Sequence, residues 1–352
     1  IFAVQGWVPA RAEADVLALA EDRGLAVTLE APRDDETPPT LLDTSDGVPG
    51  SEALTTFYRV PPYRSWDPSL VVFSSFAIFF SMILADAGYA LVLGGLLALY
   101  WKRLGGSAGG RRLRSMAGVL VGAALLYGMF AGSYFGAELD GDGVLAAVAF
   151  IDVADVDTMM VVSIAIGALH VSLANAVRAR QGWGTPLAWV SLGWIAVTWG
   201  GFVIWQASAT VGAALLVTGL LAVVAGGGAA RPVHEPSDWL WRILGGLQGL
   251  TRVSTLFGDV LSYMRLFALG LASASLAATF NSLAGQLADG TPGIGLLLGL
   301  LVLLFGHGIN LALGIVSGAV HGLRLNFIEF FGWGLSEEGY PFKAFARREV
   351  SQ

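Results

Sequence analysis

The fold is decided by PGIGLLLGLLVLLFGHGINLALGIVSGAVHGLRLNFIEFFGW, residues 292–333, a run of 42 residues whose only proline is the first. A helix that crosses the hydrocarbon core of a bilayer needs about 20 apolar residues. At about 1.5 Å per residue this run would be roughly 63 Å long as a helix. Such a helix must tilt strongly, project beyond the bilayer, or do both. The stretch therefore predicts a long membrane helix.

The rest of the chain has the same apolar character. Hydrophobic residues make up 55% of the 352 residues, charged residues make up 13%, and the mean hydropathy is +0.66. Because soluble domains carry about 25% charged residues, the composition indicates that lipid is the main solvent. The other segments long enough to cross a bilayer are 69–101, 115–137, 158–177, 186–206, 209–228 and 256–287. The expected fold class is an all-α polytopic membrane protein.

Loop charges predict how these segments cross. The stretch 102–114 carries five basic residues, whereas 138–157 carries six acidic residues and no Lys or Arg. Since Lys and Arg mark cytoplasmic loops, we expect 102–114 inside and 138–157 outside. Segment 69–101 would be roughly 50 Å long as one helix, against a hydrocarbon core of about 30 Å. It is therefore either one steeply tilted helix or a tight hairpin broken at Ala85-Asp86-Ala87-Gly88.

The number of membrane crossings that the loop charges require favours the hairpin. If the soluble N-terminus, with Arg59 and Arg64, is cytoplasmic, segment 69–101 must cross twice. The prediction is then a protein of about eight transmembrane helices with both termini in the cytoplasm. Segment 237–255 mixes tryptophan, arginine and apolar residues, which is typical of an amphipathic helix lying at the cytoplasmic surface.

Residues 1–68 are the only part with the composition of a soluble protein. The predicted elements are a strand over 2–8, a helix over 10–23 closed by Gly24, a strand over 25–30, a linker over 31–52 and an aromatic approach to the membrane over 57–67. A strand, a helix and a strand are too small to bury a core alone. We therefore expect a segment upstream of Ile1 to complete this part, and we place the membrane domain at 69–352.

Arg265 lies inside the segment 256–287, and the next charged residue along the chain is Asp289. The other residues on the same helical face are small and apolar, so its own helix offers the guanidinium few polar partners. One interpretation is an arginine that snorkels to the cytoplasmic interface. The other, which we favour, is a fixed positive charge that faces a protein-lined aqueous path.

Polar residues form a stripe along the predicted last helix. On a helical wheel they fall within about 100°, and the members are His307, Asn310, Ser317, His321 and Arg324. Glu329 lies a little to one side. A single histidine would more often be a satisfied core residue, but a stripe of this length is costly in lipid unless it faces water or polar partners. The stripe therefore favours an ion or substrate path.

Several of these runs resemble one known family. SYMRLFALGLA at 262–272 and VHGLRLNFIEFF at 320–331 resemble the last two helices of the membrane-embedded stator subunit of rotary A/V-type ATPases, called a or I. ADAGYALVL at 85–93 resembles the family's GD-x-G-[YH] turn, with Ala85 in place of the usual glycine. GWVP at 6–9 resembles the end of its cytosolic arm, and YPFKAF at 340–345 resembles its C-terminal tail.

The resemblance implies a wall of two long, tilted helices pressed against a rotating proteolipid ring, the c or K ring. Arg265 and Arg324 would face that ring. A ring carboxylate must be neutral to cross lipid, and an arginine nearby lowers its pKa so that it ionises. Two offset half-channels then force H⁺ or Na⁺ to travel by way of ring rotation. Residues 1–68 would be the end of the cytosolic arm and its linker.

The resemblance also implies the partners: the ring, the peripheral stalk subunits, a membrane subunit linked to the central stalk, and the bilayer of a prokaryotic plasma membrane, with no nucleic acid. Half-channel residues cannot be copied across, because Ser273 and Gly314 stand where eukaryotic relatives can have histidine and glutamate. The local half-channel candidates are Glu329, His321, His307, Asn310, Ser317, Asp259 and Asp86.

Catalytic chemistry is not expected of this chain. It has no cysteine, which excludes thiolate metal sites, and it shows no nucleotide-binding loop, metal-ligand cluster or nucleophile triad. We therefore expect no cofactor, no metal and no enzymatic activity of its own. The main alternative is a secondary transporter that binds an anionic substrate through Arg265 and Arg324. Transporters often show paired internal repeats, and no earlier half of the chain repeats these two segments. A structural scaffold is the third possibility, disfavoured by the polar stripe.

Overall fold

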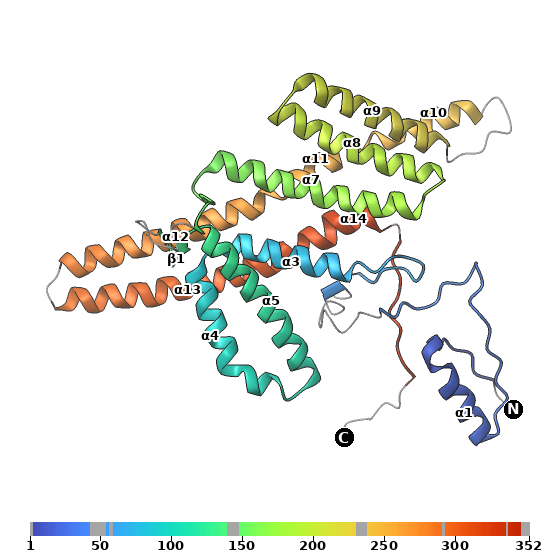
Figure 1. Cartoon of the computed structure of the whole chain (residues 1–352), viewed down its shortest axis with the longest axis horizontal. Helices are drawn as coiled ribbons and strands as arrows, with labels where there is room; N and C mark the ends of the chain where they lie inside the picture. The colour runs from blue at the N-terminus through green and yellow to red at the C-terminus, as the bar shows by residue number, and fades with distance from the viewer. Residues whose placement is uncertain are drawn as a thin grey trace. The chain divides into compact units, whose positions relative to one another are not determined.

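The computed structural model describes residues 3–42, 54–55, 59–138, 148–229, 238–290, 293–335 and 337–345. The chain divides into two compact units (Figure 1), one formed by 1–70 with 337–352 and the other by 71–336, which we call the helical unit.

The smaller unit contains one α-helix. The helix α1 (Glu13–Arg23) follows a short 3₁₀ turn, η1 (Ala10–Ala12), and ends at Gly24, whose φ of 63° lies in the left-handed region that closes helices. This confirms the predicted helix and its stop. The strands predicted over 2–8 and 25–30 are wrong for the described residues, which form no strand at 3–8 or 25–30. The physical reason is that a strand needs a neighbour for its backbone groups.

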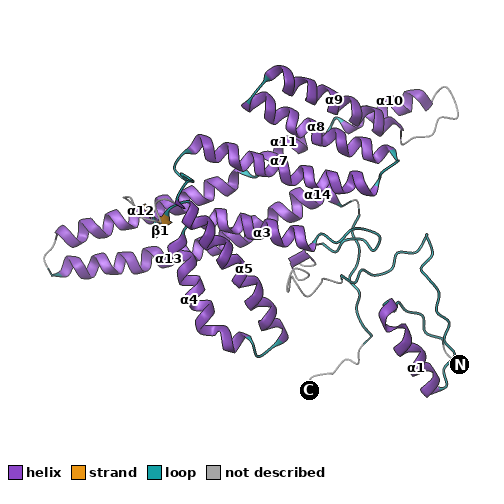
Figure 2. Cartoon of the chain, in the orientation of Figure 1, coloured by secondary structure: helices purple, strands orange, loops and turns teal. Residues whose placement is uncertain are grey.

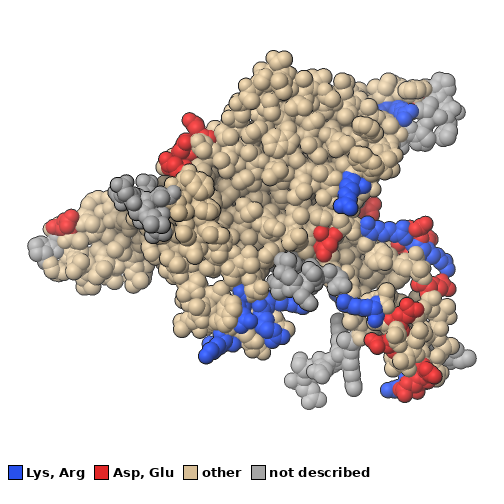
Figure 3. Space-filling model, in the orientation of Figure 1, with Lys and Arg blue, Asp and Glu red and all other residues tan. Residues whose placement is uncertain are grey.

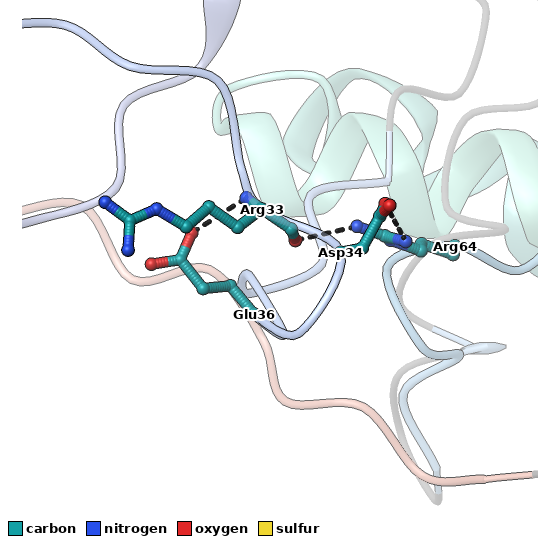
Figure 4. A network of polar contacts seen from close by, with 4 residues as sticks. All are labelled: Arg33, Asp34, Glu36 and Arg64. Carbon is teal, nitrogen blue, oxygen red and sulfur yellow. Dashed lines mark hydrogen bonds and ion pairs between the residues drawn. The ribbon is translucent and has the colours of Figure 1, made fainter.

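The remainder of this unit is tied by hydrogen bonds between distant segments. Thr40 forms an isolated parallel bridge with Pro341, and its N–H donates to Tyr340 O over 2.8 Å. Figure 4 shows Arg64 donating to Asp34 Oδ1 (3.0 Å) and to Arg33 O (2.8 Å), all on the exposed surface. Only residues 31–42 of the predicted linker are described; the rest of it lies outside the described residues.

The helical unit consists of helices and one very short hairpin (Figure 2). Its elements are α3 (Ser69–Leu84), α4 (Ala87–Leu104), α5 (Ala108–Phe130), β1 (Ser133–Tyr134), β2 (Ala137–Glu138), α7 (Val156–Gln181), α8 (Pro186–Gln206), α9 (Ala209–Ala229), α10 (Asp238–Gly249), α11 (Arg252–Leu261), α12 (Met264–Gly290), α13 (Ile294–Arg324), the π-helix η2 (Leu325–Phe330) and α14 (Phe331–Gly334). The strands β1 and β2 pair antiparallel.

Six helical runs among the described residues are long and apolar enough to cross a membrane. They are α5, α7, α8, α9, the run Asp238–Gly290 and the run Ile294–Gly334. Helix α3 is apolar but has only 16 residues. The all-α, polytopic character expected from the sequence is therefore confirmed, while the number of eight crossings stays a prediction.

The predicted break in segment 69–101 is confirmed, because α3 ends at Leu84 and α4 begins at Ala87. Asp86 caps α4 by accepting a hydrogen bond from Tyr89 N. Helix α4 then packs along α5 (Figure 1). The basic stretch 102–114 is a short turn between helix ends and not a long loop. Figure 3 shows basic side chains gathered at this end of the α4–α5 pair.

Two predicted helices differ from the observed ones. The segment 237–255 is α10 followed by the start of α11, with exposed Trp239 and Trp241. The segment 256–287 is not one continuous helix, because α11 ends at Leu261 and α12 begins at Met264. In the acidic stretch 138–157, residues 139–147 lie outside the described residues. Asp155 caps α7, and the hydrogen bonds it accepts from Thr158 hold the pKa of its carboxyl below its ordinary value.

Glycines let α13 approach its neighbours closely. Its buried positions form a stripe that consists of Gly295, Gly299, Gly306, Asn310, Gly314, Gly318 and Gly322. A Cβ on Gly299 would lie 2.8 Å from Ala284 O of α12, and a Cβ on Gly318 would lie 2.7 Å from the Phe80 ring of α3. Small residues at such contacts allow the backbones of membrane helices to approach. Helix α13 is thereby fixed on one side by α12 and α3, and its opposite side carries exposed leucines such as Leu304 and Leu313.

Candidate functional site on the last two long helices

Helices α12 and α13 run side by side in opposite directions (Figure 1). Arg265 is in the first turn of α12, and Arg324 is the last residue of α13. The antiparallel arrangement therefore brings the two arginines to the same end of the pair, although they are 59 positions apart in the sequence (324 − 265 = 59). Spacing in sequence could not predict this; the antiparallel packing of α13 on α12 explains it.

The polar residues at this end of the pair form a group that we call the inner cluster. It consists of Arg265, His321, Arg324 and Glu329. Arg265 is close enough to interact electrostatically with Arg324 and with Glu329. His321 and Glu329 each lie close enough to both arginines to interact with them electrostatically. The structure thus brings together four of the residues chosen from the sequence, and the cluster holds two guanidinium groups and one carboxylate.

Several polar atoms of the inner cluster are buried and unpaired. Nη1 of Arg265, Nδ1 of His321 and Oε2 of Glu329 have no hydrogen-bond partner among the described residues. A buried donor or acceptor that lacks a partner costs about 1–3 kcal/mol. Arg265 is half-buried, whereas Arg324 is exposed. The cluster therefore has unused capacity for a donor or acceptor from outside the described part of the chain.

Glu329 lies within the π-helix η2 and is 1% exposed. The Ser262 side chain lies beside its carboxylate, although the Ser262 hydroxyl donates to Gly258 O over 2.9 Å. A π-helix adds a residue to the turn and changes the direction of the side chains around it, and such segments are frequent at functional sites. Here the widened turn begins directly after Arg324.

A second group, the outer cluster, consists of His307, Asn310 and the residues that hydrogen-bond to them. Nδ1 of His307 lies 2.8 Å from Tyr89 Oη, and Nε2 lies 2.9 Å from Asn281 Oδ1. Asn310 Nδ2 donates to Tyr89 Oη and to Ser273 O, each over 2.9 Å. His307 and His321 are 14 positions apart in sequence, or roughly 21 Å along an α-helix. The polar stripe is therefore two separate clusters along α13.

Asp86 lies next to the outer cluster in a closed network. Its Oδ1 accepts from Tyr89 N (2.9 Å) and Phe135 N (3.0 Å), and its Oδ2 accepts from Ser133 Oγ (2.9 Å) and Gly136 N (2.8 Å). The side chain is 4% exposed as part of a buried turn. Four hydrogen bonds give this carboxylate a structural role that its sequence position did not predict.

The remaining candidates lie apart from both clusters. Ser317 is half-buried on α13 between them. Asp259 of α11 accepts a hydrogen bond from Trp333 Nε1 over 2.7 Å, and the Arg252 guanidinium lies 4.4 Å from the centre of the same indole. Asp259 therefore joins α11 to α14.

Sequence reasoning missed two groups of residues. Tyr89, Asn281 and Ser273 belong to the outer cluster. His170 of α7 is 6% exposed, and its Nδ1 lies 2.7 Å from Tyr263 Oη. Its isolation in an apolar segment was the available signal, but its partner comes from another helix. Among the described residues, no group of three or more His, Cys, Asp or Glu could hold a metal ion.

The comparisons with known proteins agree with the resemblance found in the sequence. No protein-family model matches the chain. A V-type ATP synthase subunit I of Chlamydia muridarum is 27% identical over 97% of this chain and 62% of the relative. A-type ATP synthase subunits I of Methanocaldococcus jannaschii and Thermococcus kodakarensis are 26% and 31% identical over 99% and 100% of this chain, in each case over 55% of the relative. The resemblance is confirmed across nearly the whole chain, which spans little more than half the length of these relatives.

Proposed function

We propose that the chain, whose homologues are subunits I of V-type and A-type ATP synthases, is the ion-conducting stator part of such a complex. It provides two half-channels and presents Arg265 and Arg324 to a rotating ring of small proteolipids. The observation that carries the proposal is the inner cluster, where two arginines meet at one end of α12 and α13 and Nη1 of Arg265 is buried without a partner.

The chemistry follows from the cost of charge in lipid. An isolated carboxylate in hydrocarbon is so costly that it takes up a proton or another cation. Opposite an arginine the same carboxylate becomes an anion, because a nearby positive charge lowers its pKa. Arginine suits this role because it stays charged in proteins. Each ring carboxylate that passes Arg265 therefore releases its ion.

The two clusters support two half-channels. The inner cluster lies at the end of the pair where α12 begins, and the outer cluster lies roughly 21 Å further along α13. Ser317 lies between them, and the glycine stripe closes the rest of that face. Two polar groups that do not join within the chain prevent a direct leak and force the ion onto the ring. The subunit itself performs no covalent chemistry, and ATP synthesis or hydrolysis belongs to other subunits.

A transporter of anionic substrates is the less supported alternative. It would require the arginines to line a pocket for a small molecule, whereas the Arg324 side chain is exposed. The names of the homologues also place them in a multi-subunit complex. The ring, the stalk subunits and the membrane subunit linked to the central stalk are accordingly the partners that we propose.

Photo-crosslinking tests the contact with the ring. Val320 is exposed and lies one helical turn before Arg324 on the same side of α13. A photoreactive amino acid at Val320 of the complete complex is expected to give an adduct with a small proteolipid, identified by mass spectrometry. The matched control is Leu221, an exposed residue of α9, which should give none. Adducts from both positions, or from Leu221 alone, would contradict the proposed ring-facing surface.

Glu329→Gln is expected to slow ion uptake at least about tenfold without loss of assembly, because a positioned proton-transferring side chain typically contributes about 10²–10⁴-fold to a rate. The reason is that Glu329 is the carboxylate of the inner cluster, and its Oε2 is free to accept a proton or an ion. Uptake by proteoliposomes measures this, with Asp289→Asn at the far end of α12 as the control. An unchanged rate in Glu329→Gln would show that Glu329 is an ordinary interfacial carboxylate.

We further propose that both termini and the α4–α5 turn are cytoplasmic. The chain lacks cysteine, so single cysteines at Ala108 and Ala154, both exposed, report each side. A membrane-impermeant thiol reagent added to intact cells should label position 154 and not position 108. Labelling of position 108 alone would reverse the orientation of the hairpin and contradict the placement of the inner cluster on the cytoplasmic side.

A further inference from the structure

His170 is a buried histidine of α7 that the proposed function does not use. Its ring is stacked on Phe330, with the ring centres 4.4 Å apart and the planes 7° from parallel. The Phe79 ring meets it edge-on at 5.3 Å. Nδ1 of His170 lies 2.7 Å from Tyr263 Oη, and Nε2 is buried without a hydrogen-bond partner among the described residues. The histidine therefore contacts two segments that are far apart in sequence.

The first of these segments is the interruption between α11 and α12. There the backbone hydrogen bonds tighten: Tyr263 N donates to Val260 O (3.2 Å), Arg265 N to Ser262 O (3.3 Å) and Leu266 N to Tyr263 O (2.9 Å). These are bonds across three residues, as in a 3₁₀-helix, in place of the four of an α-helix. Tyr263 is fully buried, and Gly167 of α7 gives its ring room, because a Cβ there would lie 2.7 Å from Cδ2.

The second segment is the π-helix. Phe330, which stacks on His170, is the neighbour of Glu329 in η2. Tyr263, which bonds to His170, precedes Arg265 by two positions. The tightened turn before α12 and the widened turn of η2 thus both contact the same side chain, His170 of α7. Each of these two turns lies beside a member of the inner cluster. Helix α7 packs against α11, α12 and η2.

The winding of a helix sets where its side chains point. An α-helix advances about 100° per residue and a 3₁₀-helix about 120°. If the two or three tightened residues at Ser262–Leu266 relaxed to an α-helix, Arg265 would rotate by roughly 40–60° relative to α11. A rotation of this size would move a guanidinium at the end of a long side chain by several ångströms. The orientation of Arg265 therefore depends on what holds the tightened turn.

We propose that His170 is a positioning residue: its hydrogen bond to Tyr263 and its stacking on Phe330 fix the two irregular segments and thereby aim Arg265 and Glu329 at the ion path. The proposal rests on the proposed function. His170 carries no ion itself. Its contribution is to keep the inner cluster in the one geometry in which transport is coupled to ring rotation.

The test compares variants of the complete complex in proteoliposomes, with ions transported per ATP hydrolysed as the readout. Tyr263→Phe removes one hydroxyl, and His170→Phe keeps an aromatic ring to stack on Phe330 but loses the bond. Both are expected to lower the coupling ratio about threefold or more. The double variant should be no worse than either single one, because both remove the same interaction. His170→Asn, which keeps a polar atom close to Nδ1, should retain most of the coupling. Tyr127→Phe, which removes the hydroxyl of a half-buried tyrosine of α5, should not change it.

Normal coupling in both single variants would overturn the proposal, as would losses that multiply in the double variant. Loss of assembly in both would also overturn it, because the bond would then serve folding. This outcome is distinct from failure of the proposed function. If Arg265→Lys abolished transport while His170→Phe and Tyr263→Phe stayed coupled, only the positioning role would be wrong. If Arg265→Lys transported normally, the proposed function itself would fail.

Discussion

Replacing Asp86 with alanine is expected to destabilise the helical unit strongly. The substitution leaves Tyr89 N, Phe135 N, Gly136 N and the Ser133 hydroxyl without their acceptor. The bonds from Tyr89 N and the Ser133 hydroxyl are buried, whereas those from Phe135 N and Gly136 N are only partly buried. Each buried group that loses its partner costs about 1–3 kcal/mol, so the two buried groups alone should lower the free energy of unfolding by about 2–6 kcal/mol. That is a large part of the stability of an ordinary domain. The measurement is the thermal unfolding and the yield of the assembled complex.

A matched control is available at another helix start. Asp155 caps α7 by accepting a 3.2 Å hydrogen bond from Thr158 N, and it is exposed. Asp155→Ala should therefore lower the free energy of unfolding much less, because it removes only an exposed N-cap. Asp86→Asn, which keeps one acceptor oxygen, should fall between the two. Asp86→Ala that assembles normally but no longer transports ions would contradict the structural role and favour a place for Asp86 in the half-channel.

The turn around Asp86 shows what the sequence could and could not predict. The break in segment 69–101 was predictable, because 33 residues are too many for one ordinary crossing. The conformation of the turn was not. Ala85 has a φ of 47°, in the left-handed region that favours glycine. Gly88 must be small for another reason, since a Cβ would lie 2.6 Å from the Phe135 ring.

Helix positions were predicted best where composition alone decides them. Helix α8 occupies the predicted residues 186–206, and α9 differs from its prediction by one residue. The interruption at Ser262–Tyr263 escaped prediction because nothing in the local sequence breaks a helix there: neither proline nor glycine is present. At this interruption Tyr263 packs against Gly167 and lies within hydrogen-bond distance of His170, both of which come from α7. Such contacts become visible only when the helices are packed together.

The residues of the candidate site were likewise predictable only in part. Arg265 and Arg324 were predictable because a charge inside an apolar segment is costly and therefore calls for a function. That the two arginines lie at one end of the pair became visible only from the antiparallel pairing of α12 and α13. The partners of His307 were not predictable, since Tyr89 comes from α4 and Asn281 from α12. The strands expected over 2–8 and 25–30 failed because alternation alone does not supply a neighbouring strand.

Arg265→Lys is expected to lower ATP-driven ion uptake by at least about tenfold, although lysine keeps a positive charge and much of the side-chain length. An ammonium lacks the planar fork that binds a carboxylate at two points, and it sheds its proton more easily when it is desolvated. Either defect would let ring carboxylates pass without releasing their ions or let the two half-channels communicate. Arg265→Ala should abolish uptake, and loss of the barrier should appear as a passive leak. Assembly should survive both, because Arg265 makes no hydrogen bond through its buried Nη1.

The matched control is Arg180→Lys at the end of α7, where the arginine is exposed. A lysine there should anchor the interface as well as the arginine does, so uptake should be close to that of the parent. The same would hold for Arg265 if it only snorkelled to the cytoplasmic surface. The two substitutions are chemically identical, so a difference between them reflects the position alone.

The central claim, that Arg265 couples ion movement to the ring, is tested most directly by ATP-driven ion uptake in proteoliposomes that contain the assembled Arg265→Lys complex, measured beside Arg180→Lys. We predict uptake near the background for Arg265→Lys and near the parent rate for Arg180→Lys. Near-normal uptake by the Arg265→Lys complex would contradict the claim and leave Arg324 as the remaining candidate for the arginine that faces the ring.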